Sequence, residues 1–112
     1  MVNISGNKII VPKGDTATIP FYSDLAFPFG KYIFGVKLKT DWSRDESDYL
    51  IMKELTISED FTTFEFILSS TDTSIKEGEY HWGLRRISED GVDTYETSGD
   101  FIIARRVVHD TN

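Results

Sequence analysis

The chain has 112 residues, of which 39% are hydrophobic, 28% charged and 13% aromatic. This length fits a single globular domain over residues 1–112, and the composition excludes a chain that is disordered throughout. The formal net charge of −7 disfavours nucleic acid as a partner, because phosphate backbones bind clusters of Lys and Arg. The absence of cysteine excludes disulfides, thiolate nucleophiles and thiolate metal sites.

Apolar and polar residues alternate with a period of two along most of the chain, which predicts β-strands. Turn-forming pairs such as Lys13-Gly14 and Asp90-Gly91 separate the alternating segments. Pro20 predicts that its strand lies at a sheet edge or ends nearby, because proline cannot donate a ladder hydrogen bond. The seven predicted strands are residues 8–11, 15–21, 32–40, 49–56, 62–68, 79–88 and 93–107.

Short strands separated by turns are typical of an all-β, immunoglobulin-like antiparallel β-sandwich of about seven strands. Gly78-Glu79-Tyr80, at the start of the sixth predicted strand, has the pattern of a tyrosine corner, in which the phenol bonds to upstream backbone. Trp82 follows on the same strand face and is expected to fill the centre of the core. The predicted core residues are Phe64, Phe66, Tyr80, Trp82 and Phe101.

Secretion and membrane insertion are not expected from the sequence. The first residues lack the basic and then apolar pattern of a signal peptide. The longest apolar runs are far shorter than the ~20 residues that span a bilayer. A sandwich without disulfides also suits synthesis in a reducing cytoplasm.

Few residues are candidates for catalysis. His81 lies in a predicted strand on the face opposite Trp82, where solvent exposure is expected, and His109 lies close to the C-terminus. The sequence contains no nucleophile elbow, phosphate-binding glycine loop or His-Glu-x-x-His pair. We therefore expect no catalytic residues and no cofactor, and a small hydrolase is the least favoured function.

The acidic residues Asp41, Asp45, Glu46 and Asp48 suggest a calcium site, because calcium binds several carboxylate oxygens from one loop. Their spacing does not match an EF-hand loop, and residues 88–93 offer too few ligands. A solvated acidic loop is the favoured interpretation, so no metal site is predicted.

Two aromatic segments are candidate interaction surfaces. Phe27 and Phe29 belong to an unusually aromatic loop, residues 26–30, which either plugs the open end of the core or forms an exposed patch for a neighbouring subunit. Trp42 and Tyr49 flank the acidic loop and, if exposed, would stack on sugar rings. The simpler alternative is that Trp42 packs on the third predicted strand.

An ordered set of motifs resembles the immunoglobulin-like N-terminal domain of the phage upper baseplate protein (BppU-like) from tailed phages of Gram-positive bacteria. The set covers nearly the whole chain. Its members are Lys13-Gly14-Asp15-Thr16, the alternating residues 34–39, Asp72-Thr73, Gly78-Glu79-Tyr80-His81-Trp82, Asp90-Gly91, Tyr95-Glu96-Thr97 and Gly99-Asp100-Phe101-Ile102-Ile103.

The resemblance implies a non-enzymatic structural component of a phage or prophage tail or baseplate, located in the virion. Its expected partners are other phage structural proteins or further copies of itself, and its expected role is assembly or host attachment. The alternative function is a bacterial carbohydrate-binding or adhesive immunoglobulin-like domain, whose ligand would be a cell-surface saccharide.

Overall fold

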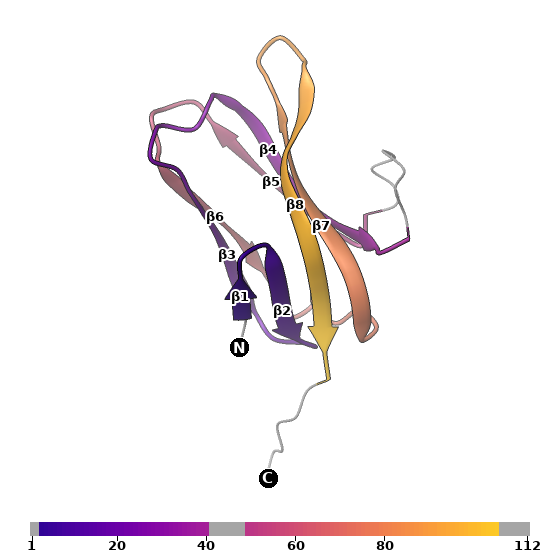
Figure 1. Ribbon diagram of the computed structural model, residues 1–112. Helices are drawn as coiled ribbons and strands as arrows, with labels where there is room; N and C mark the ends of the chain where they lie inside the picture. Colours follow the sequence, from indigo (N-terminus) through magenta and orange to yellow (C-terminus); the bar gives the residue numbers. More distant parts are fainter. Residues whose placement is uncertain (1–2, 41–48, 106–112) are drawn as a thin grey trace.

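The structure, a computed structural model, describes residues 3–40 and 49–105. Within these residues the chain forms a β-sandwich of eight strands without a helix, which confirms the predicted all-β sandwich (Figure 1). The described residues therefore include no helix that could cross a membrane. The strands are β1 (Asn3–Ser5), β2 (Lys8–Pro12), β3 (Ala17–Tyr22), β4 (Gly30–Leu38), β5 (Ile51–Ile57), β6 (Thr63–Leu68), β7 (Gly78–Ile87) and β8 (Asp93–Ala104).

Two sheets of unequal size make up the sandwich. The large sheet has the order β1-β2-β8-β7-β4-β5, and the small sheet consists of β3 and β6. All neighbouring strands are antiparallel except β2 and β8, which run parallel from Ile9 opposite Phe101 to Pro12 opposite Ala104. The antiparallel expectation thus fails at this one pair, which joins strands from near the two ends of the chain.

Seven of the observed strands overlap the seven predicted ones, and β1 is the additional strand. β4 begins at Gly30, two residues before the predicted start. β8 ends at Ala104, and the last two residues of its predicted range lie outside the described residues. One irregularity interrupts the pairing of β7 with β8, between Leu84 and Arg85.

Aromatic rings fill the space between the sheets. Phe34 on β4 is fully buried, and its ring centroid lies 5.7 Å from that of Trp82 and 5.8 Å from that of Phe66. The five predicted core side chains are all buried: Phe64, Phe66, Tyr80, Trp82 and Phe101. These rings come from both sheets, so the aromatic residues join the small sheet to the large one.

Two tyrosines fasten the loops that precede their strands. The hydroxyl of Tyr80 donates a hydrogen bond to the carbonyl oxygen of Lys76, as in the predicted tyrosine corner. The hydroxyl of Tyr32 makes the same kind of bond to Pro28, at 2.6 Å. Each bond reaches back four residues, so the residues before β4 and β7 are held by equivalent contacts.

Candidate binding groove

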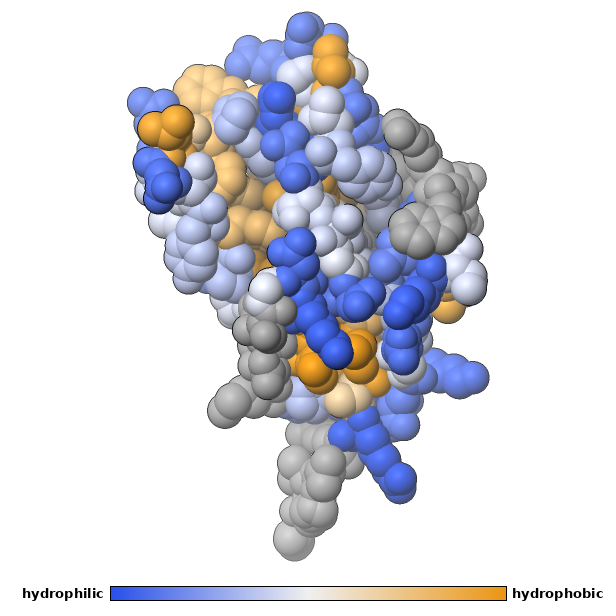
Figure 2. Space-filling model, viewed as in Figure 1, coloured by the Kyte–Doolittle hydropathy of each residue, from blue (hydrophilic) through white to orange (hydrophobic). Residues whose placement is uncertain are grey.

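A groove with a volume of about 400 Å³ lies between the two sheets, along the side of the sandwich that the small sheet leaves open. Figure 2 shows this hollow as a strip of pale-orange atoms between the left-hand part of the molecule and its centre. The groove is lined by Gly6, Asn7, Ile9, Ile19, Pro20, Phe21, Tyr22, Ser23, Phe27, Trp82, Leu84, Glu96 and Thr97.

The groove exists because the small sheet is narrow. β3 pairs with β6 on one side, and no other described strand pairs with its second side. β2, the preceding strand, pairs with β8 in the large sheet instead. A seam between the edge of β3 and the face of the large sheet therefore remains uncovered.

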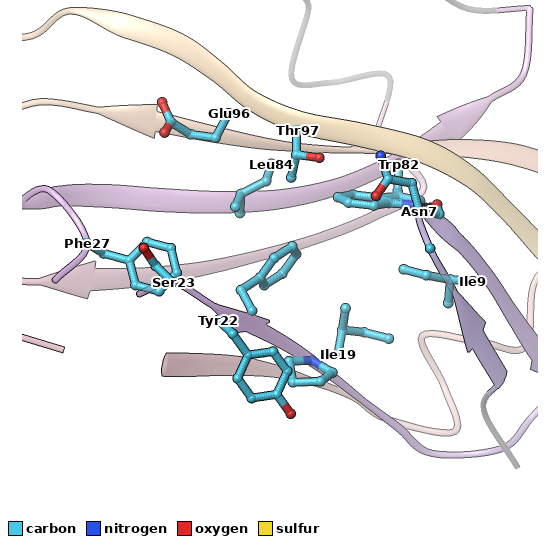
Figure 3. Close-up of a pocket in the computed structure, with 13 residues that line it drawn as sticks. Asn7, Ile9, Ile19, Tyr22, Ser23, Phe27, Trp82, Leu84, Glu96 and Thr97 are labelled. Carbon is cyan, nitrogen blue, oxygen red and sulfur yellow. Dashed lines mark hydrogen bonds between the residues drawn. The ribbon is translucent and has the colours of Figure 1, made fainter. Parts of the chain in front are cut away.

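The floor of the groove is apolar and the rim is polar. Ile9, Ile19, Trp82 and Leu84 form a floor that is itself almost inaccessible to solvent. Figure 3 shows Leu84 pointing from the large sheet toward β3, with Glu96 and Thr97 on the β8 side. An apolar floor with a few polar groups around it is the usual composition of a binding site.

The edge of β3 presents backbone groups to the groove. Ser23 donates its backbone N–H to Thr62 beside β6, at 2.9 Å. Because backbone groups alternate between the two sides of a strand, those of Thr18, Pro20 and Tyr22 face the free side. Pro20 thus occupies the edge position that its sequence predicts, with its imide nitrogen directed away from β6.

The structure separates the two aromatic residues of the loop before β4. Phe27 is partly buried, and its ring centroid lies 4.6 Å from that of Phe64 and 6.0 Å from that of Tyr32. Phe27 therefore closes one end of the core and borders the groove. Phe29 is 40% exposed and lies outside the groove lining.

Tyr49 is half-buried on the outer face of the large sheet. Its ring fills the space above Gly35, where an added Cβ would lie 2.1 Å from the ring. Lys37 places its Nζ 4.7 Å from the ring centroid. Arg85 donates a hydrogen bond to the Tyr49 hydroxyl at 3.1 Å. Tyr49 is thus already in contact with its own sheet, and Trp42 lies outside the described residues.

Two charged side chains, Lys37 and Arg85, are buried on this outer face. Lys37 lies on the strand face opposite Phe34 and Val36, yet only 2% of the residue is exposed. Arg85 is buried too and forms a two-point ion pair with Asp93, at 2.6 Å and 3.2 Å. Its hydrogen bond to Asp93 raises the pKa of Arg85, so this guanidinium stays charged. His81 is half-buried on the same face.

No group of three or more metal-ligating side chains occurs within residues 3–40 and 49–105. Residues 41–48, which contain the four acidic candidates for a calcium site, lie outside the described residues, as does His109.

No model of a known protein family matches the chain, and a search of curated proteins finds no match. The likeness to the BppU-like domain therefore rests on the ordered motifs of the sequence. The sequence reasoning missed the groove, although Pro20 and Phe27, which both line it, were each singled out for other reasons.

Proposed function

We propose that this protein is a non-enzymatic binding module of a phage or prophage tail or baseplate, which holds a neighbouring structural protein. The observation that carries the binding role is the groove beside the free edge of β3, which has an apolar floor and a polar rim. The motifs of the sequence, which resemble the BppU-like domain, supply the phage context.

The outer face of the small sheet adds to this support. Tyr22 is 77% exposed and Ile67 is 64% exposed, and Leu25 just beyond β3 is 78% exposed. Apolar side chains near a groove enlarge the surface that a partner can cover, and such patches on proteins mark contact sites.

Virion localisation tests the proposal. Purified particles from a strain that encodes the chain should contain it in a fixed ratio to the other tail proteins, and antibody labelling should place it at the tail. In a strain that lacks the chain, the tails should assemble incompletely or adsorb poorly to the host. Intact, infectious particles that contain no copy of the chain would contradict the proposal. Specific binding to host oligosaccharides by such a non-virion chain would favour the adhesive alternative.

A further inference from the structure

We propose that the groove binds an extended segment of a partner protein, with apolar side chains at alternate positions and basic residues next to them. This inference rests on the proposed binding role and specifies what the binding surface takes. It has three supports: the shape of the apolar floor, the free backbone groups of β3, and the charge of the chain.

The floor suits a partner segment that carries an apolar side chain at every second residue. Ile9 and Ile19 lie at one end of the groove and Phe27 lies at the other, with Leu84 between them on the β7 side (Figure 3). In an extended segment every second side chain points to the same face, ~7 Å from the last. Such a segment, lying along the seam, would place successive apolar side chains over the floor and direct its other side chains to solvent.

The edge of β3 fits the backbone of the same segment. Thr18 and Tyr22 each direct an N–H and a carbonyl group to the free side, and Pro20 between them directs a carbonyl group alone. Strand addition of this kind derives affinity from main-chain hydrogen bonds and specificity from alternate side chains. Pro20 removes one donor, so the added strand would form two hydrogen bonds each with Thr18 and Tyr22 and one with the carbonyl oxygen of Pro20.

Charge favours a basic segment over a second copy of this chain. Glu96, whose carboxylate lies 3.8 Å from the Arg86 guanidinium, is the single charged residue among the described residues that line the groove, and the whole chain carries a net charge of −7. Two copies would repel each other, whereas a basic segment would be attracted. A two-fold pairing of β3 with itself through Thr18 and Tyr22 would also place Pro20 opposite Pro20.

The burial of the floor favours a peptide over a saccharide. Sugars bind by stacking on an accessible aromatic face, but Trp82 at the floor is only 3% exposed.

Two synthetic heptapeptides with blocked ends test the inference: Lys-Thr-Val-Thr-Leu-Thr-Lys and its counterpart with Asp at both ends. Titrated into the labelled full chain, the Lys peptide should shift the NMR amide signals of Thr18, Tyr22 and Thr97. The Asp peptide should bind about tenfold more weakly, because like charges disfavour the complex.

Two variants test whether the Lys peptide binds in the groove. Thr97→Trp would fill the groove, and we expect it to weaken binding of the Lys peptide by about tenfold or more. Thr71→Trp places the same side chain at an exposed position of the turn between β6 and β7, outside the groove, and should leave the affinity unchanged. The inference is overturned if millimolar Lys peptide shifts no groove signal, if both variants bind alike, or if an oligosaccharide shifts these signals and the peptide does not.

Failure of the inference is distinguishable from failure of the proposed function. If a tail protein binds the wild type and Thr97→Trp equally well, the groove is not the contact and the phage role stands. If the chain is absent from virions while the Lys peptide still occupies the groove, the phage role fails and the peptide site stands.

Discussion

Trp82 donates its indole N–H to the backbone carbonyl oxygen of Asn7 at 2.8 Å, which joins the middle of β7 to the turn between β1 and β2. The side-chain amide of Asn7 in turn donates to the carbonyl oxygen of Ser98 on β8, at 3.1 Å. One residue of the turn thus satisfies a buried indole and attaches the turn to the last strand, at the end of the groove.

Smaller side chains at position 82 should destabilise the fold, and alanine should do so more than phenylalanine. Trp82→Phe removes the bond to Asn7 and should cost about 1–3 kcal/mol of unfolding free energy. Trp82→Ala also opens a cavity and should cost about 3–5 kcal/mol, a large part of a typical net stability of ~5–15 kcal/mol. Urea unfolding followed by far-UV circular dichroism measures both. A Trp82→Ala variant with the unfolding midpoint of the wild type would show that the indole does not support the core.

Gly99 should be intolerant of a side chain, because its added Cβ would lie 2.0 Å from the carbonyl oxygen of Asn7. Gly99→Ala must displace the turn, at an expected cost of about 1–3 kcal/mol. The double variant Trp82→Phe/Gly99→Ala should lose less unfolding free energy than the sum of the two single losses, because both changes act on the same turn. Gly83→Ala is the control: its Cβ would meet the movable Tyr95 side chain at 3.0 Å. Strictly additive losses would mean that the turn does not link the two sites.

The two aromatic residues of the loop before β4 should respond differently to serine. Phe27→Ser should lower the unfolding free energy by about 1–3 kcal/mol, because Phe27 packs edge-on against Phe64. Phe29→Ser should change it by less than ~0.5 kcal/mol, since Phe29 is substantially exposed. Thermal melts of the two variants test this difference. Equal losses would contradict the assignment of Phe27 alone to the core.

Stability should fall at alkaline pH because of Tyr32 and Tyr80. Burial raises the pKa of Tyr80, and it raises that of Tyr32 against the opposing effect of Arg86. In the unfolded chain these phenols ionise near pH ~10. Their contribution is therefore fully present below about pH 10 and is lost as the pH rises through the higher folded-state pKa values.

Urea midpoints measured from about pH 8 to about pH 11 test this dependence. Tyr32→Phe and Tyr80→Phe should each flatten the alkaline decline, besides losing about 0.5–1.5 kcal/mol at neutral pH with the hydroxyl bond. Tyr22→Phe, at an exposed position, is the matched control for the removal of one phenol. An alkaline decline that neither buried variant flattens would assign the effect to other groups.

Proline substitution should distinguish the two sides of β3. Thr18→Pro removes an N–H that faces the free edge, so we expect a stability change within ~1 kcal/mol and weaker binding of the Lys peptide. Phe21→Pro removes an N–H that faces β6 and should cost about 1–3 kcal/mol more than Phe21→Ala. Urea unfolding gives the stabilities and NMR titration gives the affinity. If Thr18→Pro destabilises as strongly as Phe21→Pro, the edge of β3 is not free.

Local alternation is sufficient to predict the fold class and most of the strands, because a strand buried on one face repeats every two residues. Phe64 and Phe66 on β6 illustrate this, as both face the core. The pairing partners were not predictable in the same way. The parallel contact of Ile9 with Phe101 joins residues far apart in the sequence, and no local pattern specifies it.

Tertiary contacts also explain the remaining differences between the sequence-based predictions and the structure. Lys37 alternates as an outward residue and does lie on the outer face, but Tyr49 covers it there. The groove is harder still to predict, since it arises where a strand is missing beside β3. Only Pro20 signalled the free edge, and it gave no indication that Trp82 and Leu84 lie beneath the opening.

The parallel contact between β2 and β8 has a consequence for biosynthesis. During translation β2 leaves the ribosome about 90 residues ahead of its hydrogen-bonding partner, residues 101–104. Until then Ile9 and Val11 have no neighbouring strand on that side, and such exposed strands are prone to aggregate. Pairing across so long a sequence separation also slows folding, so the nascent chain should depend on chaperones longer than a protein built from local hairpins would.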